Sequence, residues 1–277
     1  MTYDWISFTT DYGLDDGFVA ACAGVIARIA PAVRVLHVTH TIPPQDIRRA
    51  AHVLAQTAPY LPPAVHLAVV DPGVGTTRRP LVIVTPNALL VGPDNGLLVP
   101  AAEALGGIDT AHQLTDPAYR LPDVSATFHG RDIFAPAAAH LAAGIRPAQL
   151  GPAVDPATLV RLPDQGTLVH QGKLSTEVLT ADRFGNLQLA ARRSHLDAIG
   201  AAPGSSIRIE FGDDHTAKAT VTRTFADTPP GTMATFVDSA GHVAIAVNGG
   251  SAAATLGLAP GALVTLCPAS WPARSGT

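Results

Sequence analysis

The stretch Val69 to Leu81, VVDPGVGTTRRPL, places one carboxylate and two guanidinium groups around a short loop. Asp71 follows an apolar run directly, and Arg78 and Arg79 close the loop after two glycines and two threonines. Because ligands collect beyond the carboxyl ends of parallel strands, these groups are candidates for handling a small polar ligand. The G-x-x-x-x-G-K-[ST] pattern is missing, so no triphosphate is indicated. The alternative is a tight, glycine-rich connection with surface arginines.

A second group of acids follows an earlier apolar run, in TTDYGLDDG. Asp11, Asp15 and Asp16 invite a metal-site interpretation, but the D-x-[DN]-x-[DN]-G spacing of a calcium loop is not met, and we expect no metal. Asp15 or Asp16 is instead predicted to cap a helix that starts at Gly17, because Asp is favoured at amino caps. Asp11 remains at the end of a strand, where a carboxylate can accept both hydroxyls of a ribose.

A third polar cluster lies in TFHGRDIFAP, immediately before an expected helix. It contains His129, Arg131 and Asp132. His129 is either a core histidine with satisfied hydrogen bonds or a site residue, and the spacing leaves both interpretations open. Asp132 is predicted to be the amino cap of the helix.

The carboxyl-terminal part of the chain offers residue types that suit a nucleoside and an amino acid. TADRFGNLQL places Asp182, Phe184 and Asn186 around a turn, and RTFAD places Phe225 between polar neighbours. An adenine needs a stacking face and an amide that matches its donor and acceptor edge, whereas an amino acid needs a carboxylate and donors. Composition and spacing alone therefore indicate a small polar ligand between two domains.

The elements that must position these residues alternate in type over the first half of the chain. WISFTTD, VRVLHVTH and AVHLAVVDPG have strand patterns, and GFVAACAGVIARIA and DIRRAAHVLAQTA have helical ones. This alternation predicts an α/β domain with a mainly parallel sheet over residues 1–155. RPLVIVTPNALLVGPDNG contains two strand-like runs joined by Pro-Asn-Ala, which predicts a hairpin in or beside the sheet. A last helix, RDIFAPAAAHLAAG, is expected to end at Gly144.

Helical periodicity fades after the Pro-rich passage from Ile145 to Pro163. The runs SSIRIEFG, HTAKATVTRTF, TMATFVDS, GHVAIAVN and ALVTLCP are short, alternating or β-branched, and separated by turn signals. They predict an all-β barrel domain over residues 165–277, with the boundary between residues 150 and 168. The expected fold class is α/β followed by a β barrel.

Composition excludes several classes of function. The 277 residues are 47% hydrophobic, and a net charge of -4 without a run of Lys or Arg gives no footprint for nucleic acid or an anionic membrane. Cys22 and Cys267 lack metal-ligand spacing and are expected to be buried apolar residues. The amino terminus has no secretory leader and no run reaches membrane-spanning length, so we predict a cytoplasmic protein. High Ala, Pro and Gly with little Lys resembles a GC-rich bacterial coding bias.

Six motifs in order resemble those of the S-adenosylmethionine hydroxide adenosyltransferases, which are similar to the fluorinating and chlorinating enzymes that attack the same carbon. They are FTTDYG-x-x-DGFVA, VVDPGVGTTRR, GPDNGLL, TFHGRDIFAP, DRFGNL and HVAIAVNGGSAA. The resemblance spans about Trp5 to Pro268. It implies an α/β amino domain and a β-barrel carboxyl domain, assembled as a homotrimer with the active site between neighbouring subunits.

The resemblance also implies a reaction, in which water displaces the sulfonium at ribose C5′ and converts S-adenosyl-L-methionine to adenosine and L-methionine. By motif match the catalytic residues are Asp71, Arg78 and His129. Asp71 and His129 would hold and polarise the water, and Arg78 would keep Asp71 ionised and oriented. His129 would then accept or relay the proton. The leaving group is a neutral thioether, so no metal or other cofactor is expected.

Substrate-binding roles are carried over in the same way. They fall to Asp11 for the ribose hydroxyls, Asn186 and Phe225 for the adenine, Asp182 and Ser239 for the ammonium and carboxylate of methionine, and Asn248 and Ser251 for an approach to the adenine through backbone. Two positions depart from the relatives. Gln45 stands where they often have an aromatic residue near the ribose, and Ala240 where the fluorinating enzyme has an arginine near the substrate tail.

Other departures bear on the nucleophile. In the halogenating relatives the positions matching Asp71 and His129 carry tyrosines, and the fluorinating enzyme has a halide-binding serine where this chain has Gly130. An extra loop of that enzyme is also missing after Arg79. Water is therefore the predicted nucleophile. The alternatives are a chlorinase-like halogenase of the same architecture and a non-enzymatic protein that binds adenosyl compounds.

Overall fold

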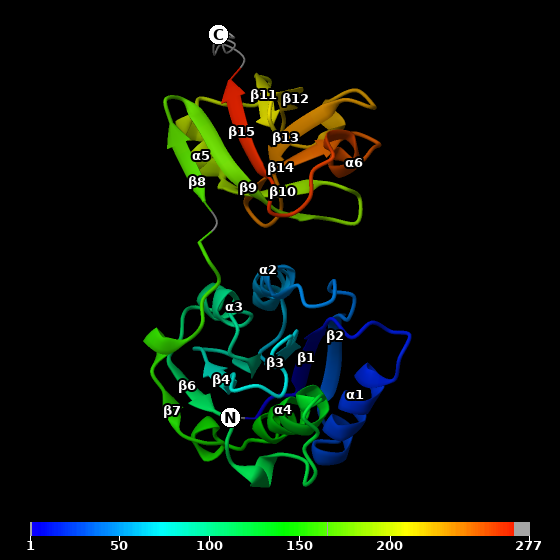
Figure 1. The fold of residues 1–277 in the computed structure, drawn as a ribbon, viewed down its shortest axis with the longest axis vertical. Helices are drawn as coiled ribbons and strands as arrows, with labels where there is room; N and C mark the ends of the chain where they lie inside the picture. The colour runs from blue at the N-terminus through cyan, green and yellow to red at the C-terminus, as the bar shows by residue number, and fades with distance from the viewer. Residues whose placement is uncertain (1, 165, 269–277) are drawn as a thin grey trace. The chain divides into compact units, whose positions relative to one another are not determined.

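A computed structural model describes residues 2–164 and 166–268 of the chain (Figure 1). The chain divides into two compact units, Met1–Leu162 and Pro163–Thr277. Each unit has hydrophobic core clusters of its own. Residue 165 and residues 269–277 of the second predicted domain lie outside the described residues.

A seven-stranded sheet forms the centre of the first unit (Figure 1). In spatial order its strands are β2 (Arg34–Thr39), β1 (Trp5–Thr10), β3 (Val65–Val69), β5 (Leu89–Pro93), β4 (Pro80–Val84), β6 (Thr110–Gln113) and β7 (Ala153–Val154). Strands β2, β1, β3 and β5 are mutually parallel, and the pairings of β4, β6 and β7 are antiparallel. The predicted hairpin is confirmed as β4–β5, with Val84 paired to Leu89.

Helices cover both faces of this sheet, so its central strands are buried on both sides. Helices α1 (Phe18–Ile29) and α4 (Ala135–Ala142) share one core cluster, and α2 (Ile47–Thr57) and α3 (Val99–Ala104) share the other (Figure 1). Alternate residues of β3 serve the two cores, because successive side chains of a strand point to opposite faces. The α/β prediction is confirmed.

The two predicted ends of helices had different outcomes. Helix α1 has Gly17 as its amino-cap residue and no side-chain cap, so the prediction for Asp15 and Asp16 is wrong. A capping side chain must belong to the residue just before the first helical turn, and both acids lie too early in the chain. Gly144 does follow α4, with φ 104° and its N–H donated to the Leu141 carbonyl oxygen at 3.0 Å.

The second unit is a closed β barrel, as predicted. Its seven strands in order are β10 (Leu187–Arg192), β14 (His242–Val247), β13 (Met233–Val237), β12 (His215–Val221), β11 (Ser206–Phe211), β15 (Leu263–Pro268) and β9 (Lys173–Ala181). Pairing of β9 with β10 closes the ring, and β8 (Thr167–His170) pairs with the first part of β9, over Lys173 to Thr176. Two short helices, α5 (Arg193–Ala198) and α6 (Ala252–Leu256), complete the unit.

Both cysteines are free and buried, as predicted. Across the described ranges, no helix combines the length and apolar character needed to cross a membrane.

Candidate active site

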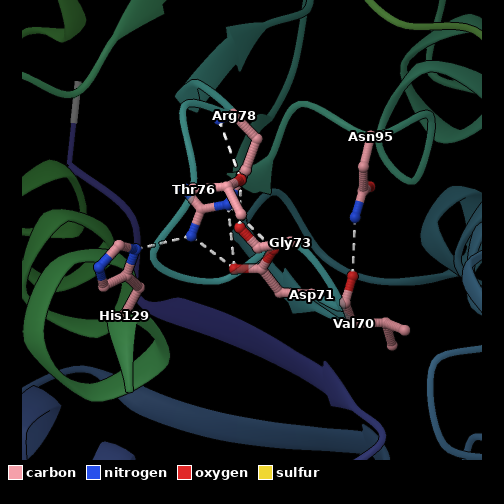
Figure 2. Close-up of polar contacts among 7 residues, drawn as sticks. All are labelled: Val70, Asp71, Gly73, Thr76, Arg78, Asn95 and His129. Carbon is pink, nitrogen blue, oxygen red and sulfur yellow. Dashed lines mark hydrogen bonds and ion pairs between the residues drawn. The ribbon is translucent and has the colours of Figure 1, made fainter. Parts of the chain in front are cut away.

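The first two acids of the predicted site emerge at the same edge of the sheet. Asp11 directly follows β1, and Asp71 lies just beyond β3. The two strands are parallel neighbours, with Thr10 paired to Val69, so their carboxyl ends coincide. The Asn95 side chain donates a hydrogen bond to the Val70 carbonyl oxygen at 2.9 Å and fixes the exit of β3 (Figure 2).

Arg78 clamps the Asp71 carboxylate through two of its nitrogens (Figure 2). Nε lies 2.9 Å from Oδ1 and 3.1 Å from Oδ2, and Nη2 lies 2.5 Å from Oδ2. The side chains of Asp71 and Arg78 are only 6% and 10% exposed. A fork of this kind fixes the carboxylate geometrically as well as electrostatically. The two groups form a rigid ion pair at the strand end.

The loop between them is shaped by local contacts and by a close approach of backbone. Thr76 Oγ1 donates to the Gly73 carbonyl oxygen at 2.7 Å (Figure 2). Gly75 has φ +77°, and a Cβ there would come within 2.5 Å of the Ala126 carbonyl oxygen. Glycine is therefore required, and it lets this loop pack against the segment that carries His129.

The two adjacent arginines of the loop have different roles. Arg79 pairs with the buried Asp94 through Nε at 2.7 Å, and its Nη2 donates to the Thr158 carbonyl oxygen at 2.6 Å. These contacts tie the loop to the rest of its own unit. Arg78 is the arginine of the candidate site.

His129 joins the ion pair from a distant part of the chain. Its Nδ1 lies 2.8 Å from Arg78 Nη2 (Figure 2). A guanidinium has donors only, so Nδ1 must be the acceptor and the neutral ring carries its proton on Nε2. Burial, and then the Arg78 charge, lower the pKa of His129. The structure therefore brings Asp71, Arg78 and His129 into one network with a neutral imidazole.

These contacts bear on the role predicted for His129, which is to accept or relay the proton. Its Nδ1 lone pair is taken by Arg78, and a second positive charge on the ring would face the guanidinium. Like charges at this distance disfavour protonation. His129 can instead donate a hydrogen bond from Nε2. The Asp71 carboxylate is a group that can accept a proton.

A buried carboxylate, rather than a helix cap, holds the segment around His129. Asp132 lies inside a π-helical turn, Gly130–Phe134, so the prediction that it caps the helix is wrong. Its side chain is fully buried, accepts from the Ser125 backbone N–H at 2.8 Å, and pairs with Arg131 at 2.6 Å. Without such partners, burial of a charge would be costly. The ion pair thus braces the turn that presents His129.

Asp11 is oriented by the loop after β2. Its Oδ2 accepts a hydrogen bond from the Gln45 backbone N–H at 2.9 Å. Gln45 itself has φ 67°, a conformation uncommon for residues other than glycine. Residue 45 therefore contributes its backbone to the Asp11 carboxylate.

In the barrel unit, three of the predicted binding residues lie in the turn between β9 and β10 and in the segment before α6, which contacts that turn. Asp182 Oδ2 accepts from the Asn186 side-chain amide at 2.8 Å, and Oδ1 accepts from the Asn186 backbone N–H at 2.9 Å. The Gly185 carbonyl oxygen accepts from Ala253 N–H at 2.9 Å. Ser251, two residues earlier, caps α6. Asp182, Asn186 and Ser251 are thus brought together.

Asn248 and Phe225 form a second group, joined through one loop. The Asn248 side chain donates to the Thr228 carbonyl oxygen at 2.6 Å, and Thr228 Oγ1 donates to the Phe225 carbonyl oxygen at 3.0 Å. The Phe225 ring is 48% exposed and rests edge-on against Phe236, with centroids 5.2 Å apart. A braced, half-exposed ring is suited to stacking on a planar ligand.

Ser239 lies apart from Asn248. It is exposed in the turn between β13 and β14, at the opposite end of β14 from Asn248. A strand of this length spans about 20 Å. The neighbouring Asp238 contacts the Gln188 side chain and accepts from the Ala240 backbone N–H. Position 240 therefore contributes backbone to a structured turn.

Sequence reasoning missed two aromatic residues that these contacts reveal. Tyr12 lies within the quoted TTDYG motif, and a Cβ on Gly130 would meet its hydroxyl oxygen. Phe236 supports Phe225 from β13. Phe236 packs with three alanines, Ala234, Ala244 and Ala246, in a small cluster that is separate from the main core of the barrel. In the part of the chain that the structure describes, no three His, Cys, Asp or Glu side chains are grouped to hold a metal ion.

A carboxylate clamped by a guanidinium beside a neutral imidazole can hold and polarise a small nucleophile. Fold and site together therefore define an enzyme built from an α/β unit and a β barrel.

Comparison with known proteins places this enzyme in a family. Residues 6–151 match the SAM hydroxide adenosyltransferase N-terminal domain, and residues 176–265 match the corresponding C-terminal domain. The chain belongs to the SAM hydroxide adenosyltransferase family.

Individual relatives agree with this assignment. The chain is 57% identical over 257 residues to a protein of Salinispora arenicola named (R)-S-adenosyl-L-methionine hydrolase, covering 93% of this chain and 95% of that protein. A fluorinase of Actinopolyspora mzabensis is 27% identical over 90% of this chain and 92% of its own length. The crystal structure of an uncharacterized conserved protein from Thermotoga maritima superposes with a TM-score of 0.89 at 34% identity, covering 95% of this chain and 99% of that one.

Proposed function

We propose that this protein hydrolyses S-adenosyl-L-methionine to adenosine and L-methionine. The observation that carries the proposal is the Asp71–Arg78–His129 network, in a chain of this family. The name of the Salinispora arenicola relative specifies the (R) configuration at sulfur, and we extend that preference to this chain.

The geometry suggests how the three residues divide the work. Asp71 accepts a proton of the attacking water, and His129 donates from Nε2 to the water oxygen. Arg78 holds both groups in place through the contacts in Figure 2. The water oxygen bonds to C5′, the bond from C5′ to sulfur breaks, and the electron pair leaves with sulfur. The water proton passes to Asp71 as the new bond makes it acidic.

The leaving group explains why we propose catalysis by side chains without a metal or other cofactor. Sulfur departs as a neutral thioether, so neither protonation nor a Lewis acid is needed at that end. The substrate's positive charge disappears as the new bond forms. A water-poor site favours such a step, because the buried ion pair replaces bulk solvent around the nucleophile.

Substrate binding would draw on both kinds of unit. Asp11 would bind the ribose hydroxyls, Asn186 and Phe225 the adenine, Asp182 and Ser239 the methionine end, and Asn248 and Ser251 the surroundings of the adenine. We further propose a homotrimer, in which the α/β unit of one subunit supplies the catalytic groups and a neighbour's barrel supplies the adenine platform. The proposed catalytic residues and the proposed adenine-binding residues lie in different units, which supports active sites formed by two neighbouring subunits. A cytoplasmic, bacterial protein would fit this composition.

Incubation with each sulfur epimer of the substrate in H₂¹⁸O tests the proposal. We expect ¹⁸O in the 5′-hydroxyl of adenosine, unlabelled methionine, and faster turnover of the (R) epimer. Added chloride should leave the adenosine yield unchanged. Formation of a 5′-chloro nucleoside would instead indicate the chlorinase-like alternative. Tight binding without either product would indicate a non-enzymatic adenosyl-binding protein.

A further inference from the structure

The hydroxyl of Tyr12 occupies the space into which any side chain at position 130 would project. An ideal Cβ built on Gly130 would lie 1.9 Å from the Tyr12 hydroxyl oxygen and 3.0 Å from Cζ of the ring. Gly130 directly follows His129 in the chain. An aromatic side chain from the loop after β1 therefore fills the side-chain space of the residue that follows His129.

Neighbouring rings hold Tyr12 in this position. Its ring packs edge-on against Phe128 at 5.7 Å and lies 6.0 Å from Phe18. Phe18 and Phe128 also contact each other edge-on at 5.2 Å, and the Arg131 guanidinium covers Phe128 at 4.9 Å. Edge-to-face aromatic pairs of this kind resist reorientation. The Tyr12 ring is thus held in place by Phe18 and Phe128.

Tyr12 also responds to the charges of the catalytic network. Burial raises its pKa well above the usual value, and Cys22, Asp11 and Asp71 raise it further, whereas Arg78 acts in the opposite direction. The phenol therefore keeps its proton at neutral pH. Its hydroxyl faces Gly130.

We propose that Tyr12 is a specificity-determining residue that sizes the nucleophile's space beside Asp71 and His129, admitting water and excluding larger nucleophiles. The inference rests on the proposed hydrolysis and adds a reason why solvent is the nucleophile. Size exclusion follows from rigid volume: the ring and hydroxyl fill the gap that the absent side chain of Gly130 leaves. Packed interiors accommodate even one extra methylene poorly.

Competition between water and methanol tests the exclusion. Methanol attack would join its oxygen to C5′, break the bond from C5′ to sulfur, release the methanol proton to Asp71 and give 5′-O-methyladenosine with methionine. The natural chain should give adenosine alone. Tyr12→Ala should raise the ratio of ether to adenosine at least about 10-fold, and Tyr60→Ala should not change it, since Tyr60 is 82% exposed. An unchanged ratio in an active, folded Tyr12→Ala protein would overturn the proposal.

A double-mutant cycle tests the contact between Tyr12 and position 130 with smaller changes in side-chain volume. Gly130→Ala should lower kcat at least about 10-fold, because its methyl group would displace the Tyr12 hydroxyl. Tyr12→Phe removes that hydroxyl, so the double variant should recover most of the loss. Additive losses would contradict the shared volume. Failure of the proposed function would be recognised by a different result, because the natural chain would then make no adenosine.

Discussion

The two units of this protein assemble their polar residues in different ways. In the α/β unit, Asp71 and Arg78 come from one motif, His129 comes from a distant one, and the three form one network. In the barrel unit, Asp182 and Asn186 share a turn, whereas Ser239 lies at the far end of β14 from Asn248. Parallel strands end at one edge of a sheet, so the loops after them converge. Antiparallel strands reverse direction at each step and send successive loops to opposite ends. Motif order is therefore a stronger guide to a site in the first unit than in the second.

The largest expected effect concerns the carboxylate of the converged network. Asp71→Asn should lower kcat about 100-fold or more and leave the substrate Kd nearly unchanged, because it removes the proton acceptor while keeping the side-chain size. Single-turnover kinetics and calorimetry with substrate would measure the two quantities.

Asp123→Asn is a matched control for that variant, since Asp123 is exposed and carries the same change in charge. A full rate in Asp71→Asn would remove the water-activating role. A large rise in Kd would move Asp71 from catalysis to substrate binding.

The second prediction separates a hydrogen-bond donor from a base at position 129. His129→Gln keeps an amide that can accept from Arg78 or donate toward the water, whereas His129→Ala keeps neither. We expect kcat to fall about 100-fold in His129→Ala and about 10-fold in His129→Gln. Equal losses in both variants would favour a proton-accepting imidazole, against the Nδ1 contact described above.

The third prediction concerns the barrel. Phe225→Ala should raise KM about 10-fold with little change in kcat, because base stacking on an aromatic ring contributes about 1–3 kcal/mol. Leu168→Ala, an exposed change on β8 outside the closed ring, is the control. A loss confined to kcat would show that the barrel ring acts on the reacting centre, which would weaken the contrast between the units.

The sequence supported the fold because its patterns are local. Each pattern depends on residues that are neighbours along the chain: the alternating strands and helices, the Pro-Asn-Ala hairpin and the short β-rich runs. The two sheets, and the cores packed against them, follow from these elements. The cap prediction for Asp15 or Asp16 was wrong because helix starts shift by a residue or two, and the one for Asp132 was wrong because this buried acid has other partners.

The protonation state of His129 lay beyond the sequence for a different reason. It depends on one contact with Arg78 across the fold. The conflict between Tyr12 and a side chain at position 130 is likewise a property of packing in three dimensions.

The smallest expected effect concerns how pH changes the stability of the α/β unit relative to the barrel unit. His66 is 1% exposed in β3 and its Nδ1 lies 2.7 Å from Ser7 Oγ, and burial lowers its pKa to about 4. The unfolded chain, with a histidine pKa of about 6.5, binds more protons between these values, so the free energy of unfolding falls as pH drops from 6.5 toward 4. His66 alone should contribute about 1–2 kcal/mol to the loss between pH 6.5 and pH 5.

Urea unfolding at pH 7 and pH 5 would measure this loss in the natural chain and in two variants. His66→Gln should show a smaller difference between the two pH values, because it removes the group that the folded state keeps neutral. His170→Gln, an exposed change in the barrel unit, should retain the full difference. If both variants lost it equally, the acid sensitivity would not originate in the buried strand beneath Asp71. The site-bearing sheet would then be no more sensitive to protons than the barrel.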